Sequence, residues 1–420
     1  MVDIFDRIHK DSGGPIGQYL EQAFGYYMYP RLEGELGPHM IFNGMPVLNW
    51  SLNNYLGLAN HPEVRKADAE AAAQYGLAYP MGARMMSGQT RYHEKLEKMF
   101  ADFEKKEDAF LFNFGYQGIV STIDALTSRH DVIVYDAECH ACLLDGIRLH
   151  IGEKFKYRHN NIEDCEKVLA RACSVAEENG GGVLLITEGV FGMTGALGIL
   201  DKITALKKKY QFRILIDDAH GFGLLGEHGR GTSEHFGCMD EVDLYIGAFA
   251  KSMASIGGFV AGPHYIINYL RANLRSQMYA KSLPMAFVLG NIKRLEIIDS
   301  PEGDELRKKC WAITHAIQDG FRKEGFDIGE AEACVTPVHI KGGVAQATKM
   351  AKDLRENYKI FCSVVIYPVI PKGMVIFRIV STAAHTMEDV EYTLNAFKEI
   401  KAKLDAGYYD GDELAAMTIM

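Results

Sequence analysis

The chain has 420 residues, of which 48% are hydrophobic and 24% charged, a balance that fills a sizeable core and excludes global disorder. Its 55 acidic residues exceed its 45 Lys and Arg residues, and the resulting net charge of −10 argues against nucleic acid as the main partner. The N-terminus lacks the apolar core of a signal peptide, and no apolar run approaches the length of a membrane span. We therefore expect a cytoplasmic protein and leave open a peripheral contact with a membrane.

The first half of the chain has the pattern of an α/β protein. After an N-terminal arm, residues 52–76 predict a loop that runs into a helix, and from about residue 107 short apolar runs alternate with amphipathic segments. The expected strands are 108–114, 131–137, 154–159, 183–190, 212–220 and 243–249. Strands separated by helices are typical of βαβ units, so we expect a mainly parallel sheet covered by helices on both faces.

The pattern changes near residue 290. Residues 285–325 predict helix with a break at Ser300–Pro301, and the C-terminal tail predicts an appended segment. Strands are expected at 335–340, 361–370 and 374–380, and helices at 344–357 and 387–405. This mixture predicts a smaller α+β domain after the parallel sheet. The expected parts are an N-terminal arm (1–55), a large domain (56–289) and a small C-terminal domain (290–420).

Two motifs point to chemistry that the surrounding residues do not support. Gly221, Gly223 and Gly226 have the spacing of a dinucleotide-binding fingerprint and follow a strand. The residues after them are loop-like, and the helix that would bind a pyrophosphate is missing, which argues against a nicotinamide cofactor. Cys139 and Cys142 form a C-x-x-C pair, but no second pair exists to complete a zinc site, so two buried thiols are favoured and no metal site is expected.

Four polar features follow strands of the predicted sheet. Asp217 lies at the end of a buried apolar strand, where a carboxylate is costly unless it meets a cation. Lys251 follows the next strand, His140 begins the helix after another, and a helix N-terminus at Gly115 and Tyr116 could hold a phosphate. Unrelated buried polar residues are the simpler interpretation for any one of them. Together they supply a nucleophilic amine, an acid, a phosphate site and a flat imidazole, which are the groups that pyridoxal phosphate requires.

The chain also resembles a known family from about residue 45 to 405. The matching segments are NNYLGLANHP (53–62), Arg84 with Ser87-Gly88, YRHNNIEDCEKVL (157–169), EGVFGMTG (188–195), IDDAHGFGLLGEHGRGT (216–232), AKSMASIGGFVAG (250–262) and YPVIPKG with FRIVSTAAHT (367–386). They resemble the α-oxoamine synthases of the fold-type I pyridoxal-phosphate enzymes. The resemblance implies an α/β, aspartate aminotransferase-like fold with a mainly parallel seven-stranded sheet in the large domain.

The resemblance implies roles for four catalytic residues. Lys251 corresponds to the lysine that forms the Schiff base with the cofactor and later moves the α-proton. Asp217 corresponds to the partner of the pyridine nitrogen, and His220 to the residue that reaches the phenolic oxygen. His140 corresponds to the histidine that stacks on the ring and orients the substrate carboxylate.

Further positions match the cofactor and substrate contacts of the family. The amides of Gly115 and Tyr116 are expected to bind the phosphate. Asn53 and Arg378 match the positions that grip the substrate carboxylate, for which a bidentate arginine is well suited. Lys281 is expected to replace, as a charge, a hydroxyl that relatives supply across the subunit boundary, which implies a homodimer with shared active sites.

The implied activity is the decarboxylative condensation of an α-amino acid with an acyl-CoA or acyl-carrier-protein thioester. The resemblance favours the long-chain-base branch, similar to serine palmitoyltransferase. Serine is the expected amino acid, with its sulfonated analogue cysteate as a further candidate because Gly192, Ala248 and Ala250 stand where the family commonly has Ser or Thr. The alternatives are a glycine C-acetyltransferase (2-amino-3-ketobutyrate CoA ligase), an 8-amino-7-oxononanoate synthase, or an accessory subunit without catalysis.

Overall fold

The computed structural model describes residues 1–10, 17, 19–366, 370 and 373–411. Two compact units form the chain: a large unit of Asn53–Lys309, and a small unit that combines Met1–Leu52 with Cys310–Met420. Part of the predicted strand 361–370 and most of the predicted C-terminal tail lie outside the described residues.

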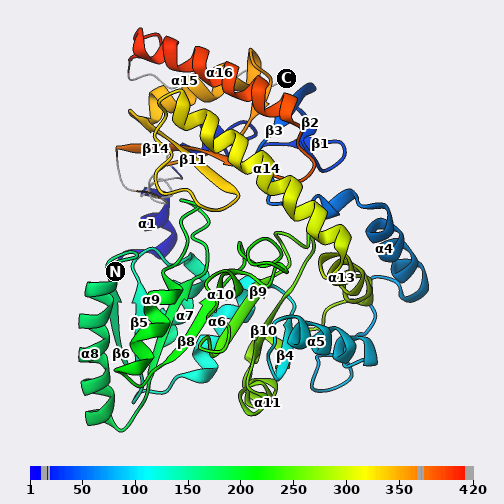
Figure 1. Cartoon of the computed structure of the whole chain (residues 1–420), viewed down its shortest axis with the longest axis vertical. Helices are drawn as coiled ribbons and strands as arrows, with labels where there is room; N and C mark the ends of the chain where they lie inside the picture. The colour runs from blue at the N-terminus through cyan, green and yellow to red at the C-terminus, as the bar shows by residue number, and fades with distance from the viewer. Residues whose placement is uncertain (11–16, 18, 367–369, 371–372, 412–420) are drawn as a thin grey trace. The chain divides into compact units, whose positions relative to one another are not determined.

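The large unit is built on a seven-stranded sheet (Figure 1). In spatial order its strands are β4 (Asp108–Phe112), β10 (Gly258–Gly262), β9 (Leu244–Ala248), β8 (Arg213–Asp217), β7 (Val183–Glu188), β5 (Val132–Asp136) and β6 (Glu153–Tyr157). β10 is antiparallel to both of its neighbours, and the remaining adjacent pairs are parallel. The predicted fold class is confirmed. The sequence did not predict β10 as a strand because its GFVAG segment begins and ends with glycine, which is depleted in strands.

Helices cover both faces of this sheet. The helices of the large unit are η1 (Leu58–Asn60), α4 (Pro62–Tyr75), α5 (Arg91–Phe103), α6 (Gly115–Leu126), α7 (Ala141–Leu149), α8 (Ile162–Asn179), α9 (Leu200–Ala205), η2 (Leu206–Lys208), α10 (Thr232–His235), α11 (His264–Asn273), α12 (Arg275–Met278) and α13 (Met285–Ile298). On one face Val260 packs with apolar residues of α6, α7 and α11. On the opposite face the ring of Phe259 stacks on Phe100 of α5, with centroids 4.1 Å apart.

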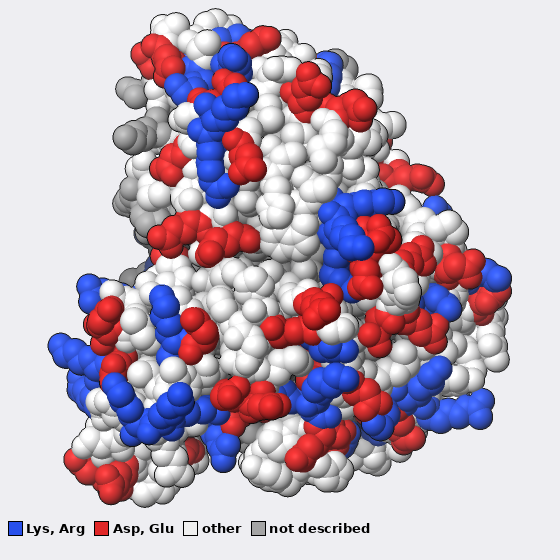
Figure 2. All heavy atoms as spheres, in the orientation of Figure 1, with Lys and Arg blue, Asp and Glu red and all other residues white. Residues whose placement is uncertain are grey.

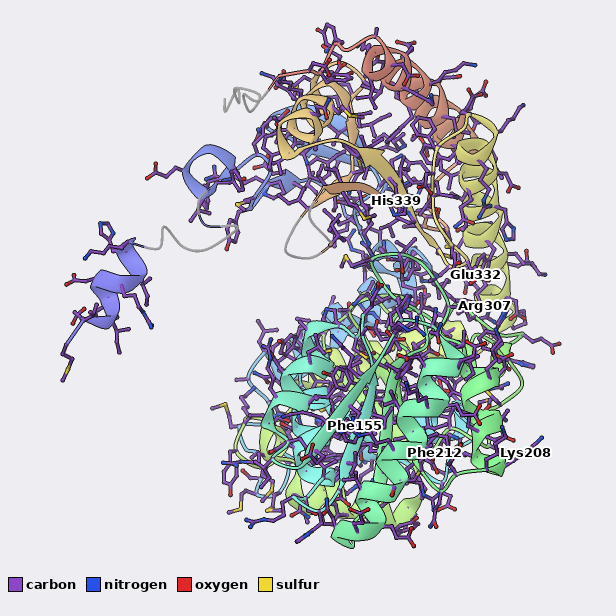
Figure 3. The ribbon with its side chains drawn as sticks, turned by 90° about the vertical axis from the view of Figure 1, so that its left-hand side faces the viewer. Phe155, Lys208, Phe212, Arg307, Glu332 and His339 are labelled. Carbon is purple, nitrogen blue, oxygen red and sulfur yellow. The ribbon has the colours of Figure 1, made fainter. Side chains whose placement is uncertain are left out.

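The edge strand β6 is covered by α8. The guanidinium of Arg171 lies 4.4 Å from the ring centroid of Phe155, which Figure 3 labels on β6. α8 begins at the N-cap Asn161, whose side chain accepts from the Asp164 amide, and it ends at Gly180 in the left-handed conformation. This helix fills the interval between the expected strands 154–159 and 183–190.

The small unit contains two further sheets. Its elements are α1 (Ile4–Lys10), α3 (Leu20–Ala23), β1 (Leu32–Glu33), β2 (His39–Phe42), β3 (Met45–Asn49), β11 (Val335–Lys341), α15 (Val344–Glu356), β12 (Ile360–Phe361), β13 (Ser363–Val365), β14 (Met374–Val380) and α16 (Met387–Asp405), and α14 (Pro301–Lys323) leads into it from the large unit. The strand orders are β1-β2-β3-β12 and β11-β14-β13. Apolar residues of α14, α15 and α16 pack with β11 and β14 in one core.

The boundaries of the two units differ from the expected ones at residues 55 and 289. The N-terminal segment belongs to the small unit because β3 pairs in parallel with β12, with Leu48 opposite Ile360. The large unit extends beyond residue 289 because α13 packs on α4, where Arg294 forms two hydrogen bonds with Asp68.

Acidic and basic side chains are interspersed on the face in Figure 2, so the net charge of −10 is not gathered in one patch there. Among the described residues, no helix combines the length and the apolar character that crossing a bilayer requires.

A buried histidine in the small unit makes its stability dependent on pH. His385 stacks on Trp50 at a centroid distance of 3.8 Å, its Nε2–H donates to the Asn49 carbonyl, and its Nδ1 accepts from the Thr382 amide. Burial lowers its pKa to about 4. In the unfolded chain His385 takes up a proton near pH 6.5, whereas in the folded chain it stays neutral down to about pH 4. The contribution of this histidine to the free energy of unfolding is therefore fully present above pH 6.5 and is lost as the pH falls towards 4.

We expect the free energy of unfolding of the wild type to fall by about 2 kcal/mol through this group between pH 7 and pH 5. His385→Gln should flatten the pH dependence by that amount, although it lowers stability at pH 7. Urea unfolding at both pH values measures the two slopes. Equal slopes for the variant and the wild type would contradict the assignment.

Candidate active site

Three neighbouring parallel strands of the large unit end in buried carboxylates. These carboxylates lie at the edge of the sheet where the carboxyl ends of the parallel strands meet. Asp217 ends β8, Glu188 ends β7 and Asp136 ends β5, and the strand register sets Glu188 opposite Asp217. All three are at most 5% exposed. Burial raises the pKa of Asp217, and burial together with the nearby Asp217 raises the pKa of Glu188. A cationic group bound at this edge would therefore be stabilised.

The Asp217 carboxylate accepts a hydrogen bond from a backbone amide and lies beside a thiol. Its Oδ1 accepts from the Ala219 amide at 3.1 Å, and its Oδ2 lies 3.7 Å from the Cys142 thiol, a weak donor. The Ala219 hydrogen bond and the positive charge of Lys251 oppose the effect of burial on the Asp217 pKa. Oδ2 therefore retains the capacity to accept from a bound N–H group.

Lys251 is carried on a turn that follows β9. The Phe249 amide donates to the Gly257 carbonyl at 3.0 Å, and the Ser255 amide donates back to the Phe249 carbonyl at 2.8 Å. Gly257 has a φ of +120°, and a Cβ there would meet the Phe249 ring at 2.7 Å, so only glycine fits this position. The closed turn presents Lys251 beside the carboxylates. The positive charge of Lys251 accordingly acts to lower the pKa of both Asp217 and Glu188 against the effect of burial.

His140 is the N-cap residue of α7. Its Nδ1 accepts from the Cys142 amide at 3.3 Å and lies 2.9 Å from the Cys142 sulfur, while its own backbone amide donates to Glu188 Oε1 at 2.5 Å. Partial burial lowers the pKa of His140, and the charge of Lys251 lowers it further against the opposing effect of Asp217. Because Nδ1 accepts a backbone hydrogen bond, the neutral ring carries its proton on Nε2.

The N-terminus of α6 is a site for an anion. The amides of Gly115, Tyr116 and Gln117 precede the first intrahelical bond, which runs from the Gly118 amide to the Phe114 carbonyl at 3.0 Å. These three amides and the helix dipole favour a phosphate at this position.

This anion site lies at the same edge as the carboxylates. A Cβ on Gly115 would come within 3.2 Å of the Cβ of Ala248, the last residue of β9. The backbone of Lys281 lies near the start of α6, because Asn113 Nδ2 donates to the Lys281 carbonyl at 2.5 Å. The Lys281 side chain is exposed. Its expected role at a subunit boundary stays a prediction.

His220 follows Asp217 by three residues and contacts Tyr55. The Tyr55 hydroxyl lies 2.7 Å from His220 Nδ1, and Tyr55 is only 1% exposed. Asn53, two residues before Tyr55, begins the large unit. The large unit thus contains Lys251 and His220 together with all the other expected site residues except Arg378.

Arg378 lies in the small unit, on the central strand β14 of the three-stranded sheet, opposite Pro337 and Ser363. It is 6% exposed. The role expected for it at the substrate carboxylate stays a prediction.

Besides Asp136, which ends the apolar strand β5, sequence reasoning missed three residues of this site. Glu188 ends the apolar run VLLITE, as Asp217 ends FRILID, so the same signal was present in the sequence. Cys142 was interpreted only as half of a C-x-x-C pair, and both thiols of that pair are buried. Tyr55 gives no local signal, because its partner His220 lies 165 residues away in sequence.

Comparisons with known proteins agree with this geometry. Residues 45–397 match the aminotransferase class I and II family. The chain is 57% identical to the cysteate-C-fatty acyltransferase of Capnocytophaga ochracea over 409 residues, covering 97% of both proteins. Its structure is similar to serine palmitoyltransferase from Sphingomonas wittichii, with a TM-score of 0.89 and 28% identity over 96% of this chain and 100% of the other. A serine palmitoyltransferase solved with pyridoxal phosphate has a TM-score of 0.87 and 25% identity over the same shares.

The chain therefore belongs to the aminotransferase class I and II family and, within it, to the α-oxoamine synthases.

Proposed function

We propose that this protein condenses cysteate with a long-chain fatty acyl thioester and releases the carboxylate of the amino acid as CO2. The observation that carries the proposal is the 57% identity to a cysteate-C-fatty acyltransferase over 97% of both chains. The similarity to serine palmitoyltransferase supports the same class of reaction, an acyl transfer to the α-carbon of an amino acid.

The cofactor is pyridoxal phosphate. When bound, it supplies a conjugated cationic ring that accepts the electron pair left on the substrate α-carbon. The described residues fit this group. The α6 amides suit its phosphate, Asp217 Oδ2 is an acceptor for its ring N–H, and Lys251 lies at the same edge for its aldehyde.

Each catalytic side chain then has a defined task. Lys251 would hold the cofactor through Nζ, and the same nitrogen would serve as the base for the α-proton. Asp217 would keep the ring nitrogen protonated through a charge-assisted hydrogen bond. His140 would lie against the cofactor and offer Nε2–H to the substrate carboxylate, and His220 would offer a hydrogen bond to the phenolic oxygen.

Binding of the anionic groups is divided among other residues. Gly115 and Tyr116 donate their amides to the phosphate, and Lys281 adds a positive charge at the phosphate of a neighbouring subunit. The resemblance assigns the substrate carboxylate to Asn53 and Arg378, and holding that group would fix the α-hydrogen relative to Lys251.

The proposal that cysteate is the amino acid rests on the similarity to the Capnocytophaga ochracea acyltransferase and on three residues of the site. Gly192, Ala248 and Ala250 bring no hydroxyl groups to the site, at positions where the family commonly has Ser or Thr. A sulfonate that gains one charge-assisted hydrogen bond is favoured by about 1.5–3 kcal/mol, or roughly one to two decades in binding.

A competition assay with a fixed long-chain acyl-CoA tests this choice. Cysteate, serine, glycine and alanine compete in equal amounts, and the products are separated by mass. We expect the sulfonated product to exceed the serine product at least about tenfold. A preference for serine would reassign the amino acid. A preference for glycine with acetyl-CoA would favour a glycine C-acetyltransferase, and a protein that binds the cofactor without turnover would favour an accessory subunit.

We propose in addition that the active unit is a homodimer. The segment before α5 exposes several large apolar side chains in the large unit. They are Leu77, Tyr79, Met81, Met85 and Met86, together with Tyr279. Backbone bonds from Ser282 to Gly82 and from Met285 to Tyr79 join this segment to the stretch that carries Lys281. A second copy that covers this surface would bring Lys281 to the subunit boundary.

Replacing both Met81 and Met86 with glutamate is expected to give monomers and to lower activity at least about tenfold, because charges would be buried in the interface. Sedimentation velocity measures the oligomeric state. Tyr265→Glu is the control, since Tyr265 is 65% exposed on α11, which follows the far end of the antiparallel strand β10. An active monomer of the wild type would contradict the shared site. The cytoplasmic location expected from the sequence stays a prediction.

A further inference from the structure

His220 is held on two sides by residues that have no assigned role in the reaction. On one side, the Tyr55 hydroxyl lies 2.7 Å from Nδ1, and the two rings meet edge to face with centroids 6.1 Å apart. Tyr55 is 1% exposed, so its hydroxyl meets this ring in a site from which bulk water is largely excluded.

On the other side, the ring edge that carries Nε2 lies against Gly192. A Cβ on Gly192 would come within 2.3 Å of His220 Nε2 and 2.8 Å of Cδ2, closer than atoms can approach. The backbone of Gly192 does not have a positive φ, so its conformation is open to any residue. The space taken by the His220 ring is therefore what requires glycine here.

The direction of the Tyr55 hydrogen bond decides which nitrogen of His220 is a donor. A hydroxyl can donate to Nδ1 or accept from it. If Tyr55 donates, the neutral imidazole carries its proton on Nε2, on the side of Gly192. His140 provides a parallel within the same site, because its Nδ1 accepts a backbone amide and its Nε2 carries the proton.

We propose that Tyr55 and Gly192 are positioning residues for His220: Tyr55 donates to Nδ1 and fixes the Nε2–H tautomer, and Gly192 gives the ring the space it needs. The inference rests on the proposed function only for the target of that N–H, the phenolic oxygen of the cofactor. The tautomer itself is a property of the protein and can be measured without turnover.

The first test is the nitrogen NMR spectrum of the full-length protein labelled with [15N]histidine. The chain has 15 histidines, and His220→Asn identifies the signals of His220 by their loss. We expect a protonated Nε2 and an unprotonated Nδ1 in the wild type, with and without cofactor, and a mixture of tautomers in Tyr55→Phe. A protonated Nδ1 in the wild type, or no change in Tyr55→Phe, would overturn the proposal.

The second test follows the absorbance of the bound cofactor against pH. A donor at the phenolic oxygen stabilises its anionic form, so weakening that donor should raise the midpoint of the titration. Tyr55→Phe and Gly192→Ala should each raise it by roughly 0.5–1 pH unit, the size of one lost hydrogen bond. In a His220→Asn background neither substitution should move it further.

Matched controls separate positioning from general destabilisation. Tyr409→Phe removes a buried tyrosine hydroxyl that donates to Asp353 in the small unit, and Gly37→Ala adds a Cβ that meets no atom within 4 Å. Both should leave the midpoint unchanged. A midpoint that moves equally in these controls would contradict the proposal. Absence of cofactor binding with an intact Nε2–H signal would reject the proposed function and leave the tautomer assignment standing.

Discussion

Lys251→Ala is expected to abolish turnover, with a loss of at least about 10⁴-fold. In the proposed mechanism one nitrogen is responsible for two steps, because it attaches the cofactor and then moves the α-proton, and proton transfer alone contributes about 10²–10⁴-fold. The turn that carries Lys251 is closed by backbone bonds of Phe249, Ser255 and Gly257, so alanine should leave the fold intact.

Borohydride reduction followed by peptide mapping locates the attached cofactor. We expect the label on Lys251 in the wild type and no labelled peptide in Lys251→Ala. Lys156→Ala is the matched control, since Lys156 is exposed on the edge strand β6 and should affect neither label nor turnover. A label on a different lysine would refute the assignment of the nucleophile.

Asp217→Asn is expected to lower kcat by about 10²–10³-fold while cofactor binding is retained. The effect of removing one preorganised charged partner at a reacting centre is of this size. Asparagine keeps the shape of the side chain but lacks the negative charge that we propose keeps the ring nitrogen protonated. The substitution also removes the free-energy cost of burying a charged carboxylate, which is reflected in the raised pKa of Asp217.

The neighbouring Asp218 offers a sharp control. Asp218 is fully buried, and it accepts from the Thr232 amide, the Thr232 hydroxyl and the Tyr245 hydroxyl. Asp218→Asn should lower the free energy of unfolding by roughly 1–3 kcal/mol and leave kcat per folded molecule nearly unchanged. If both variants lose kcat equally, the role of Asp217 is structural.

The strand ends could be predicted because they leave a local signal. A charged residue that closes a buried apolar run, such as Asp217 in FRILID, stands out in any window of six residues. The ends of α8 also carry local signals, since Asn161 caps its start and Gly180 follows its last residue. Local rules of burial and capping apply at these places without knowledge of the rest of the chain.

Contacts between distant segments could not be predicted in this way. Pairing of Leu48 with Ile360, which joins the N-terminal segment to the small unit, leaves no mark near either residue. The contact of Tyr55 with His220, and the space that His220 requires at Gly192, likewise appear only when the chain has folded. β10 was missed for a different reason, because glycines at both of its ends weaken the strand pattern.

The most direct measurement follows the carboxylate of the amino acid. The full-length protein with bound pyridoxal phosphate is given [1-13C]cysteate and a long-chain acyl-CoA, and labelled CO2, free thiol and product mass are recorded together. A carbon–carbon bond forms between the α-carbon and the acyl carbonyl, the carbon–sulfur bond of the thioester breaks, and the carboxylate leaves as CO2. We predict equal amounts of labelled CO2, free thiol and an unlabelled sulfonated amino ketone. A product that retains the label, or thiol release without CO2, would contradict a decarboxylative condensation.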